Sequence, residues 1–356
     1  MYIKKIKLKN FRNYSEQEIE LSENINIIYG DNAQGKTNII EAIFLCAMGK
    51  SFRDKKEKDL IKFNESFSKI SVFYKKMDRE GKIEVEISDK KTFYINDIKQ
   101  KKVRDVIGKI NVVIFTPDDI EIMKEGPQRR RKFLDMMISP IKPKYISILS
   151  EYNKIIEQRN EYLKQINIEN KERNILDIWD EQLSACSEEI YKYRKDYTDK
   201  IREKIEYTHN LIVEDKKEEI KIKYISNGDS KEKFLENLKK TRELDIKRGF
   251  TQTGIHRDDI IIYINGKQVS IFGSQGQQRT VVLTLKLCEI NIVKEEIGED
   301  PILLLDDFMS ELDGKRKKRF LENIKGKQVI ITCTDRIKIK NDSKVFLIEK
   351  GKIVRE

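Results

Sequence analysis

The chain has 356 residues, of which 38% are hydrophobic and 37% are charged, so it can build a core beneath a strongly charged surface. This length fits two domains, or one large domain with an insertion. The net charge of +11 favours an anionic partner, most often nucleic acid, although a genome of biased base composition would also enrich lysine.

Several classes of protein do not fit the composition. No apolar run approaches the ~18 residues that a membrane span needs, and the N-terminus lacks the apolar block of a signal peptide. The chain holds only two histidines and no Cys-x-x-Cys pair, which argues against a zinc site and a histidine-centred hydrolase. Its scattered cysteines suggest a reducing cytoplasm; they are Cys46, Cys186, Cys288 and Cys333.

The first part of the chain predicts strands around one strong helix. Residues 37–49 have helical apolar spacing, and Gly49 is a plausible C-cap. The segment 82–100 has the character of a hairpin-rich sheet, and 109–116 predicts a buried strand that stops at Pro117. Further strands are expected at 2–11, 17–21 and 25–30.

From about Gly126 to Arg248 the character becomes helical. Two amphipathic faces, separated by a polar loop at 167–174, predict an antiparallel helical pair, either an ordinary subdomain or a partner-binding coiled coil. One face consists of Leu149, Tyr152, Ile156, Leu163 and Ile166, and the other of Leu176, Trp179, Leu183, Cys186, Ile190, Tyr193 and Tyr197.

The rest of the chain predicts a return to α/β structure. Strands are expected at 218–226 and, after a short helix, at 258–272, with Asn265-Gly266 as a type I′ hairpin turn. Then come a helix from Gln277, a strand 301–307, a helix from Gly314, and strands 327–334 and 344–354. We therefore expect an α/β ATPase lobe split in sequence, 1–120 and 249–356, around a helical insertion at 121–248.

One segment carries phosphate-binding chemistry. "GDNAQGKT" satisfies G-x-x-x-x-G-K-[ST] between a predicted strand and a predicted helix. Lys36 can neutralise the β- and γ-phosphates of ATP, and the Thr37 hydroxyl can bind Mg²⁺. The backbone of the loop, with the helix N-terminus behind it, suits the triphosphate itself; its residues are Gly30, Asp31, Asn32, Ala33, Gln34, Gly35, Lys36 and Thr37.

The apolar segment "PILLLDD" supplies the carboxylates that such a loop needs on an adjacent strand. Asp306 ends the strand and is expected to hold Mg²⁺ at the carboxyl edge of a parallel sheet. Asp307 follows it and is placed to orient or deprotonate the attacking water.

The segment "FGSQGQQRT" resembles the Ser-Gly-Gly-Gln signature of ABC-class ATPases at the start of a helix. Ser274 would be the hydroxyl donor, with Gln275 and Gly276 completing the phosphate clamp. Since the signature of this class lies on the far side of its own domain from the phosphate loop, it must serve ATP held by another copy. A homodimer with two ATP molecules at its interface follows.

Two further segments fit the same class. "SELD", Ser310 to Asp313, resembles the D-loop that crosses the dimer interface. Thr334 occupies the place where many ABC ATPases carry a switch histidine, so a histidine-dependent step is in doubt. No glutamine follows "VVIFTPDD" where a Q-loop is expected; Asp118 or Asp119 is the candidate replacement.

Taken together, these motifs resemble the RecF family of bacterial recombination and repair ATPases, nearly from end to end. One departure is Ile255, where the family usually has proline before His-Arg-Asp-Asp. The resemblance rests on "LKNFRNY", "GDNAQGKTN", "GKSFR", "GPQRRRKFLD", "GIHRDD", "FGSQGQQRT" and "LLLDDFMSELD".

The resemblance implies a DNA-binding dimer that forms on ATP and acts at single-strand gaps independently of base sequence. It implies a slow, DNA-stimulated ATPase activity that serves as a dimerisation switch. It also implies cooperation with RecR and RecO in loading RecA, and a link to the SOS response. One candidate for DNA contact is the basic segment Arg129, Arg130, Arg131 and Lys132; a solvated helix face or a nucleotide-sensing role are the alternatives.

Three other classes of ATPase fit the sequence less well. An SMC- or Rad50-type chromosome-maintenance ATPase would need a far longer helical insertion. An ABC transporter subunit would need a membrane partner and usually carries Leu-Ser-Gly-Gly-Gln. An OLD-type nuclease ATPase would append an acidic metal-binding domain after the ATPase.

Overall fold

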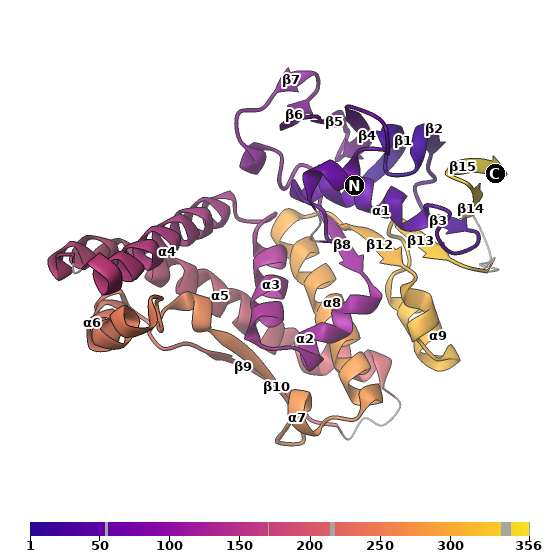
Figure 1. The fold of residues 1–356 in the computed structure, drawn as a ribbon. Coiled ribbons are helices and arrows are strands. Elements are labelled where there is room, and N and C mark those ends of the chain that lie inside the picture. The colour runs from indigo at the N-terminus through magenta and orange to yellow at the C-terminus, as the bar shows by residue number, and fades with distance from the viewer. Residues whose placement is uncertain (54–55, 170, 214–217, 336–342, 356) are drawn as a thin grey trace. The chain divides into compact units, whose positions relative to one another are not determined.

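The computed structural model describes residues 1–53, 56–169, 171–213, 218–335 and 343–355. Its packing divides the chain into two compact units, Met1–Asp119 with Leu211–Val213 and Glu289–Glu356, and Ile120–Asn210 with Glu214–Cys288 (Figure 1). The first unit is built from both ends of the chain, as a split α/β lobe requires. Residues 249–288 pack within the second unit. Packing units and functional domains are different divisions of a chain, so the expected limits of the helical insertion, 121–248, stay a prediction.

A six-stranded sheet organises the first unit, in the order β15-β14-β3-β13-β12-β8. All neighbouring strands run parallel except β15, which is antiparallel to β14. The strands are β3 (Ile25–Tyr29), β8 (Val112–Phe115), β12 (Ile302–Asp306), β13 (Val329–Cys333), β14 (Ser343–Glu349) and β15 (Lys352–Arg355).

The strand order corrects one expectation, namely that the strand of Asp306 is adjacent to the strand before the phosphate loop. β13 lies between β3 and β12. The expected site does not depend on adjacency, because parallel strands present all their carboxyl ends at one edge of the sheet. Asp306 therefore still reaches the phosphate loop across a single strand.

A second sheet of the first unit is antiparallel, in the order β2-β1-β4-β5-β6-β7. The sequence-based prediction missed β4, although its apolar residues alternate and the alternate positions are buried. The strands are β1 (Tyr2–Phe11), β2 (Tyr14–Glu20), β4 (Ser68–Lys76), β5 (Arg79–Ile87), β6 (Lys91–Ile95) and β7 (Ile98–Lys99).

Helix α1 (Lys36–Met48) lies between these two sheets. It packs against β4 and β5 of the antiparallel sheet and against β8, β12 and β13 of the parallel sheet. Ten consecutive residues, Ile39 to Met48, are buried, which explains why the helix is apolar on all its faces. It ends as expected at Gly49, whose φ of 70° is the left-handed conformation of a C-cap.

An aromatic cluster fixes helix α9 (Gly314–Asn323) in the first unit. The ring centroid of Phe320, on α9, lies 5.2 Å from that of Phe115 on β8 and 5.9 Å from that of Phe308. Phe308 directly follows Asp306-Asp307, so this packing also holds the segment after the carboxylates.

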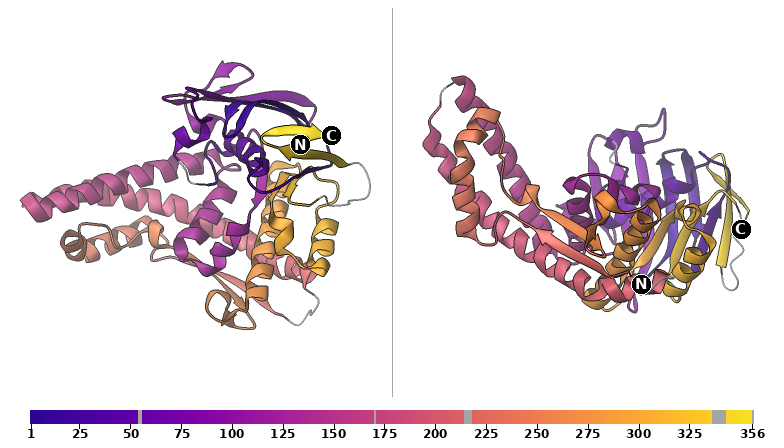
Figure 2. Two further views of the ribbon diagram at one scale, coloured as in Figure 1. Left: turned by 45° about the vertical axis from the view of Figure 1, so that its right-hand side comes forward. Right: turned by 90° about the horizontal axis from the view of Figure 1, so that it is seen from below.

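The second unit is mainly helical, and its two longest helices run antiparallel. Tyr145 of α4 packs edge to face against Tyr193 of α5, while Arg159, further along α4, pairs with Asp180, earlier on α5. The expected helical pair is confirmed (Figure 2). The helices are α2 (Glu121–Lys124), α3 (Pro127–Ile138), α4 (Pro143–Glu169), α5 (Leu176–Ile212), α6 (Lys231–Arg248), α7 (Val269–Phe272) and α8 (Gln275–Ile297), whose last turns belong to the first unit.

A small sheet completes the second unit, in the order β11-β10-β9. Asn265 and Gly266 both have positive φ, 49° and 75°, so the expected type I′ turn is confirmed. The strand expected at 258–272 is shorter than predicted, because α7 takes its last four residues. The strands are β9 (Ile220–Ile225), β10 (Asp259–Ile264) and β11 (Lys267–Gln268).

The strand expected at 344–354 is a hairpin instead. Lys350 and Gly351 have φ of 46° and 72° and turn the chain from β14 into β15. Within the described residues, no helix has both the length and the apolar character to cross a membrane.

Candidate functional site

The phosphate loop connects β3 to α1, and its glycines permit a backbone that other residues would not adopt. Gly30 and Gly35 have φ of 147° and 112°. A Cβ atom on Gly30 would lie 2.4 Å from the carbonyl oxygen of Ile348. The Lys36 ammonium is buried against the loop and donates to the carbonyls of Gly30 and Asp31, at 2.7 and 2.9 Å. The loop therefore already surrounds the cation that would meet phosphate.

Two turns from distant parts of the sequence clamp this loop. Asn13, in the β1–β2 turn, donates through Nδ2 to the Gln34 carbonyl at 2.8 Å, and the amide of Gly351 donates to the same oxygen at 3.1 Å. The Gln34 side chain in turn accepts from the amide of Lys350, at 2.6 Å. The Tyr14 hydroxyl donates to the Gly35 carbonyl at 3.1 Å. The position of the loop thus depends on residues more than 300 positions apart.

A buried carboxylate on α1 organises two arginines beside the loop. Glu41 is fully buried and accepts two hydrogen bonds from Arg12, at 2.6 and 2.9 Å, and one from the Ser51 hydroxyl, at 2.5 Å. Arg53 lies 3.6 Å from Glu41 and donates to the Asn38 side chain at 3.0 Å. Paired charge of this kind is the condition for burying a carboxylate.

The carboxyl ends of β12 and β13 bring the predicted metal ligands together. Burial raises the pKa of Asp306, while hydrogen bonds from the hydroxyls of Thr37 and Thr332 act against that rise. The Thr332 hydroxyl lies 2.8 Å from Asp306 Oδ1 and accepts from the amide of Asp307 at 3.0 Å. Asp307 has a φ of 48°, the left-handed conformation, so the chain turns sharply directly after the strand.

Three further residues that the sequence analysis named also follow strands of this sheet. Thr334 directly follows β13, which separates the phosphate-loop strand from the Asp306 strand. Asp118 and Asp119 follow β8, the neighbour of β12 on its other side. Asp119 accepts from the amide of Thr116 at 2.8 Å, whereas Asp118 is exposed; the role of either one in place of the Q-loop glutamine stays a prediction.

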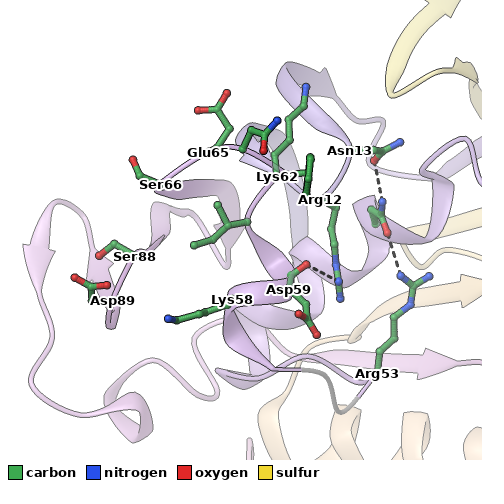
Figure 3. A pocket seen from close by; sticks show the side chains of 14 residues that line it. Arg12, Asn13, Arg53, Lys58, Asp59, Lys62, Glu65, Ser66, Ser88 and Asp89 are labelled. Atoms are coloured by element: carbon green, nitrogen blue, oxygen red, sulfur yellow. Dashed lines mark hydrogen bonds between the residues drawn. The ribbon is translucent and has the colours of Figure 1, made fainter.

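A pocket opens beside the phosphate loop in the first unit, with a volume of about 860 Å³ (Figure 3). Arg12, Asn13, Asn38 and Arg53, which organise the loop, form one wall. Phe63, 88% exposed, belongs to another wall. The volume lies within the range of small-molecule sites, although the lining is mostly polar and charged; the other lining residues are Lys58, Asp59, Ile61, Lys62, Asn64, Glu65, Ser66, Ser88 and Asp89.

The signature lies in the second unit, at the start of α8. Ser274 is exposed and caps the helix: its Oγ accepts from the amide of Gln277 at 3.2 Å, and its own amide donates to Gln277 Oε1 at 3.1 Å. This is a capping box. The amides of Gln275 and Gly276 are the first two of the helix, which intrahelical carbonyls cannot reach.

The arginine-rich segment opens helix α3, and its guanidinium groups face other protein groups. Arg130 is 6% exposed and forms a two-bond pair with Asp259, at 2.6 and 2.9 Å. Arg131 donates to the Asp258 carbonyl at 2.7 Å, and burial lowers its pKa. Arg129 pairs with Glu121 and Glu125, at 2.6 and 2.8 Å. A solvated helix face is therefore the wrong interpretation for Arg130, while DNA contact by Arg129, Arg130, Arg131 and Lys132 stays a prediction.

Sequence reasoning missed Arg12, Asn13, Glu41 and Gln277 as parts of these sites. The Ser-x-x-Gln spacing of the capping box was visible in the sequence. For Glu41 the signal was a charged residue within an apolar helix, which must have a partner.

The fold and these sites define the class: a P-loop ATPase head of the ABC type, split in sequence around a helical insertion. A family model described as an AAA domain matches residues 5–223. The "DNA replication and repair protein RecF" of Clostridium botulinum is 44% identical over 366 residues that cover 100% of both chains. Its counterpart from Acetivibrio thermocellus is 42% identical over 99% of both chains.

Solved structures agree with these relatives. "Structure of the recombination mediator protein RecF-ATPrS in RecFOR pathway" superposes with a TM-score of 0.93 and 40% identity, covering 99% of this chain and 97% of that chain. The corresponding RecF-ATP structure has a TM-score of 0.92 and 41% identity. The chain belongs to the RecF family.

Proposed function

We propose that this chain is an ATP-dependent DNA-binding protein of recombinational repair and replication restart. The observation that carries the proposal is the convergence of Lys36, Thr37 and Asp306 at one edge of the parallel sheet. Relatives that share the whole length of the chain are named for DNA replication and repair, and similar solved structures hold ATP or an analogue in the RecFOR pathway.

ATP would bind through its phosphates to the loop Gly30 to Thr37, with the Lys36 ammonium leaving the loop carbonyls for the β- and γ-phosphates. The pocket beside the loop then suits the nucleoside end. It has the volume for a base and a ribose, and it shares Asn13 and Asn38 with the network that holds the loop.

Mg²⁺ fits the residues present, because the Thr37 hydroxyl and the buried Asp306 carboxylate are the oxygen ligands that this ion prefers. When bound, the ion would neutralise charge on the phosphates. Asp307, at the sharp turn that follows the strand, would orient or deprotonate the attacking water.

The signature would complete the site of another copy. Ser274, Gln275 and Gly276 offer a hydroxyl and two free helix amides, a suitable set of donors for the γ-phosphate of ATP bound to the partner's phosphate loop. Two such sites make a symmetric homodimer that forms on ATP and dissociates after slow hydrolysis.

The dimer would bind double-stranded and gapped DNA through phosphates rather than base edges, consistent with the net charge of +11. RecR and RecO are the expected partners, loading of RecA at single-strand gaps is the expected outcome, and the SOS response is the expected link. The expected setting is the cytoplasm.

Gel filtration of the protein with and without ATP, on and off gapped DNA, tests the proposal. We expect a monomer without nucleotide, a dimer with ATP and Mg²⁺, and tighter DNA binding by that dimer. DNA affinity that is the same with and without ATP would contradict an ATP-dependent binder, whatever the oligomeric state.

A further inference from the structure

A chain of hydrogen bonds in the second unit links the signature serine to a buried histidine. Gln277, which closes the capping box with Ser274, donates through Nε2 to Glu218 Oε1 at 2.8 Å. The other oxygen of Glu218 lies 3.1 Å from Nε2 of His209, in the last turn of α5. Nδ1 of the same ring lies 3.0 Å from the hydroxyl of Thr284, two turns into α8. This series of hydrogen bonds thus begins and ends on α8 and passes through α5.

The chemistry of these groups gives each bond a direction. Burial lowers the pKa of His209, so its imidazole is neutral at neutral pH. A carboxylate only accepts, so His209 carries its proton on Nε2 and donates to Glu218. Nδ1 then accepts from the Thr284 hydroxyl, whose single proton would otherwise go to the Thr280 carbonyl, 2.9 Å away.

The carboxylate also fixes the amide of Gln277. Since Glu218 can only accept, it selects the orientation in which Nε2 of Gln277 faces it. Oε1 must then face the amide of Ser274, which is the orientation that the capping box needs. With the opposite orientation, the Ser274 amide would face an NH₂ group.

The direction of these hydrogen bonds determines whether the hydroxyl group of Ser274 can still donate its proton. Ser274 Oγ accepts from the amide of Gln277, so its hydroxyl proton is free to be donated outward. Ser274 is exposed, whereas His209 is fully buried. A rigid interior therefore holds an exposed hydrogen-bond donor.

We propose that Glu218 and His209 are positioning residues that hold the Ser274 hydroxyl as a donor for the γ-phosphate of ATP bound to a second copy of this chain. This inference rests on the proposed function, since it assigns the supports of the same signature. Neither residue touches the nucleotide. Each acts through Gln277, and the 37-residue helix α5 is thereby joined to the phosphate clamp.

An exchange of the two facing side chains tests the chain of bonds. Gln277→Glu alone places two carboxylates against each other, and Glu218→Gln alone leaves a single acceptor oxygen for two donors, Nε2 of Gln277 and Nε2 of His209. The double variant Glu218→Gln/Gln277→Glu restores every contact: Glu at 277 accepts from the Ser274 amide and from the new glutamine, which accepts from His209. Glu219→Gln, at the next, exposed carboxylate, is the matched control.

Three quantities are measured for each full-length variant: ATP affinity, the protein concentration for half-maximal ATP-driven dimerisation, and the melting temperature. We expect each single variant to need about tenfold more protein to dimerise, as the loss of one charge-assisted contact implies. ATP affinity stays within twofold, because the phosphate loop lies in the other unit. The double variant returns to within threefold of wild type, and Glu219→Gln matches wild type.

The variant Ser274→Arg distinguishes two failures: that of the composite ATP site, and that of the positioning role of Glu218 and His209. If this variant dimerises on ATP like wild type, the composite site itself is wrong. If it fails to dimerise while the single variants at 218 and 277 behave as wild type, only the positioning role is wrong. Dimerisation that falls in proportion to melting temperature, or that the exchange does not restore, also overturns the positioning role, because a general loss of stability then explains it.

Discussion

The phosphate loop and the arginine-rich segment are both conspicuous in the sequence, yet they differ in where the partners of their charged groups lie. In the loop Gly30 to Thr37, the groups that would bind phosphate are main-chain amides and one lysine, which donates to a carbonyl of the loop itself. In the segment Arg129 to Lys132, the guanidinium groups of Arg130 and Arg131 are directed to Asp259 and to the carbonyl of Asp258, more than 120 residues away.

The difference shows which sequence signals can be interpreted from the segment that contains them. The spacing of the glycines determines the backbone conformation of the loop, and that conformation forms the anion site. The function of the motif can therefore be predicted from the motif alone. An arginine has five donors and no fixed partner, so its role depends on which carboxylate the fold brings to it. A run of arginines therefore indicates charge but not where that charge is used.

The largest expected effect is that of Lys36→Ala. We expect ATP binding to become unmeasurable, because the ammonium is the cation surrounded by the loop and its loss costs about 4 kcal/mol or more, roughly 10³-fold in affinity. Nucleotide titration checks this, with the exposed Lys325→Ala as control. Affinity within a few-fold of wild type would remove Lys36 from the site.

Asp307→Asn should preserve the ATP-bound dimer and slow turnover by roughly 10²–10⁴-fold, the usual cost of losing a general base or a water-orienting carboxylate. Asp306, held by Thr37 and Thr332, keeps its place in this variant. Single-turnover hydrolysis and gel filtration measure the two properties. Unchanged turnover would assign the role to another residue.

Arg130→Ala breaks a buried ion pair and leaves Asp259 without its partner, so we expect it to lower the free energy of unfolding by about 3 kcal/mol or more. Arg129→Ala, which breaks the more exposed pairs with Glu121 and Glu125, should cost less, about 1 kcal/mol. Urea unfolding of both variants compares the two positions.

The same pair of variants tests DNA contact. A residue that binds phosphate lowers the slope of log affinity against log salt by about one unit when it is replaced. If Arg130→Ala is unstable but the slope is unchanged, the segment serves the fold. If the variant folds normally and the slope falls, the prediction of DNA contact holds and the structural role is the wrong one.

A smaller expected effect is the pH dependence of the unfolding free energy that the buried side chain of His256 causes. Burial lowers the pKa of His256 to about 4, below the ~6.5 of an unfolded chain. Between these values the unfolded chain binds more protons, so the histidine's contribution, at most about 3 kcal/mol, is present above pH ~6.5 and is lost as the pH falls towards 4.

Asp258 acts in the opposite direction, because burial raises its pKa to about 6. We therefore compare wild type with His256→Gln at each pH. The difference in unfolding free energy between them should shrink as the pH falls from 6.5 to 4. A difference that does not depend on pH would mean that His256 is not buried as a neutral imidazole.

Much of the site could be predicted because its parts are local. Lys36 and Thr37 follow from one spacing, and Asp306 from an apolar strand that ends in acids. The partners of Arg12 and Arg130 could not, since Glu41 and Asp259 reach them only through the fold. The position of β13 between β3 and β12 is equally non-local, because the sequence of a fully buried strand does not indicate which strands will be its neighbours.

The place of β3 in its sheet has a consequence for the newly made protein. Both strands that flank it, β13 and β14, are synthesised on the order of 300 residues later, which at ~5–20 residues per second means roughly 15 to 60 seconds. During that time the apolar strand Ile25–Tyr29 and the helix after it have no parallel sheet to join. The nascent chain should therefore depend on chaperones until translation is nearly complete, and its ATP site would be the last part to form.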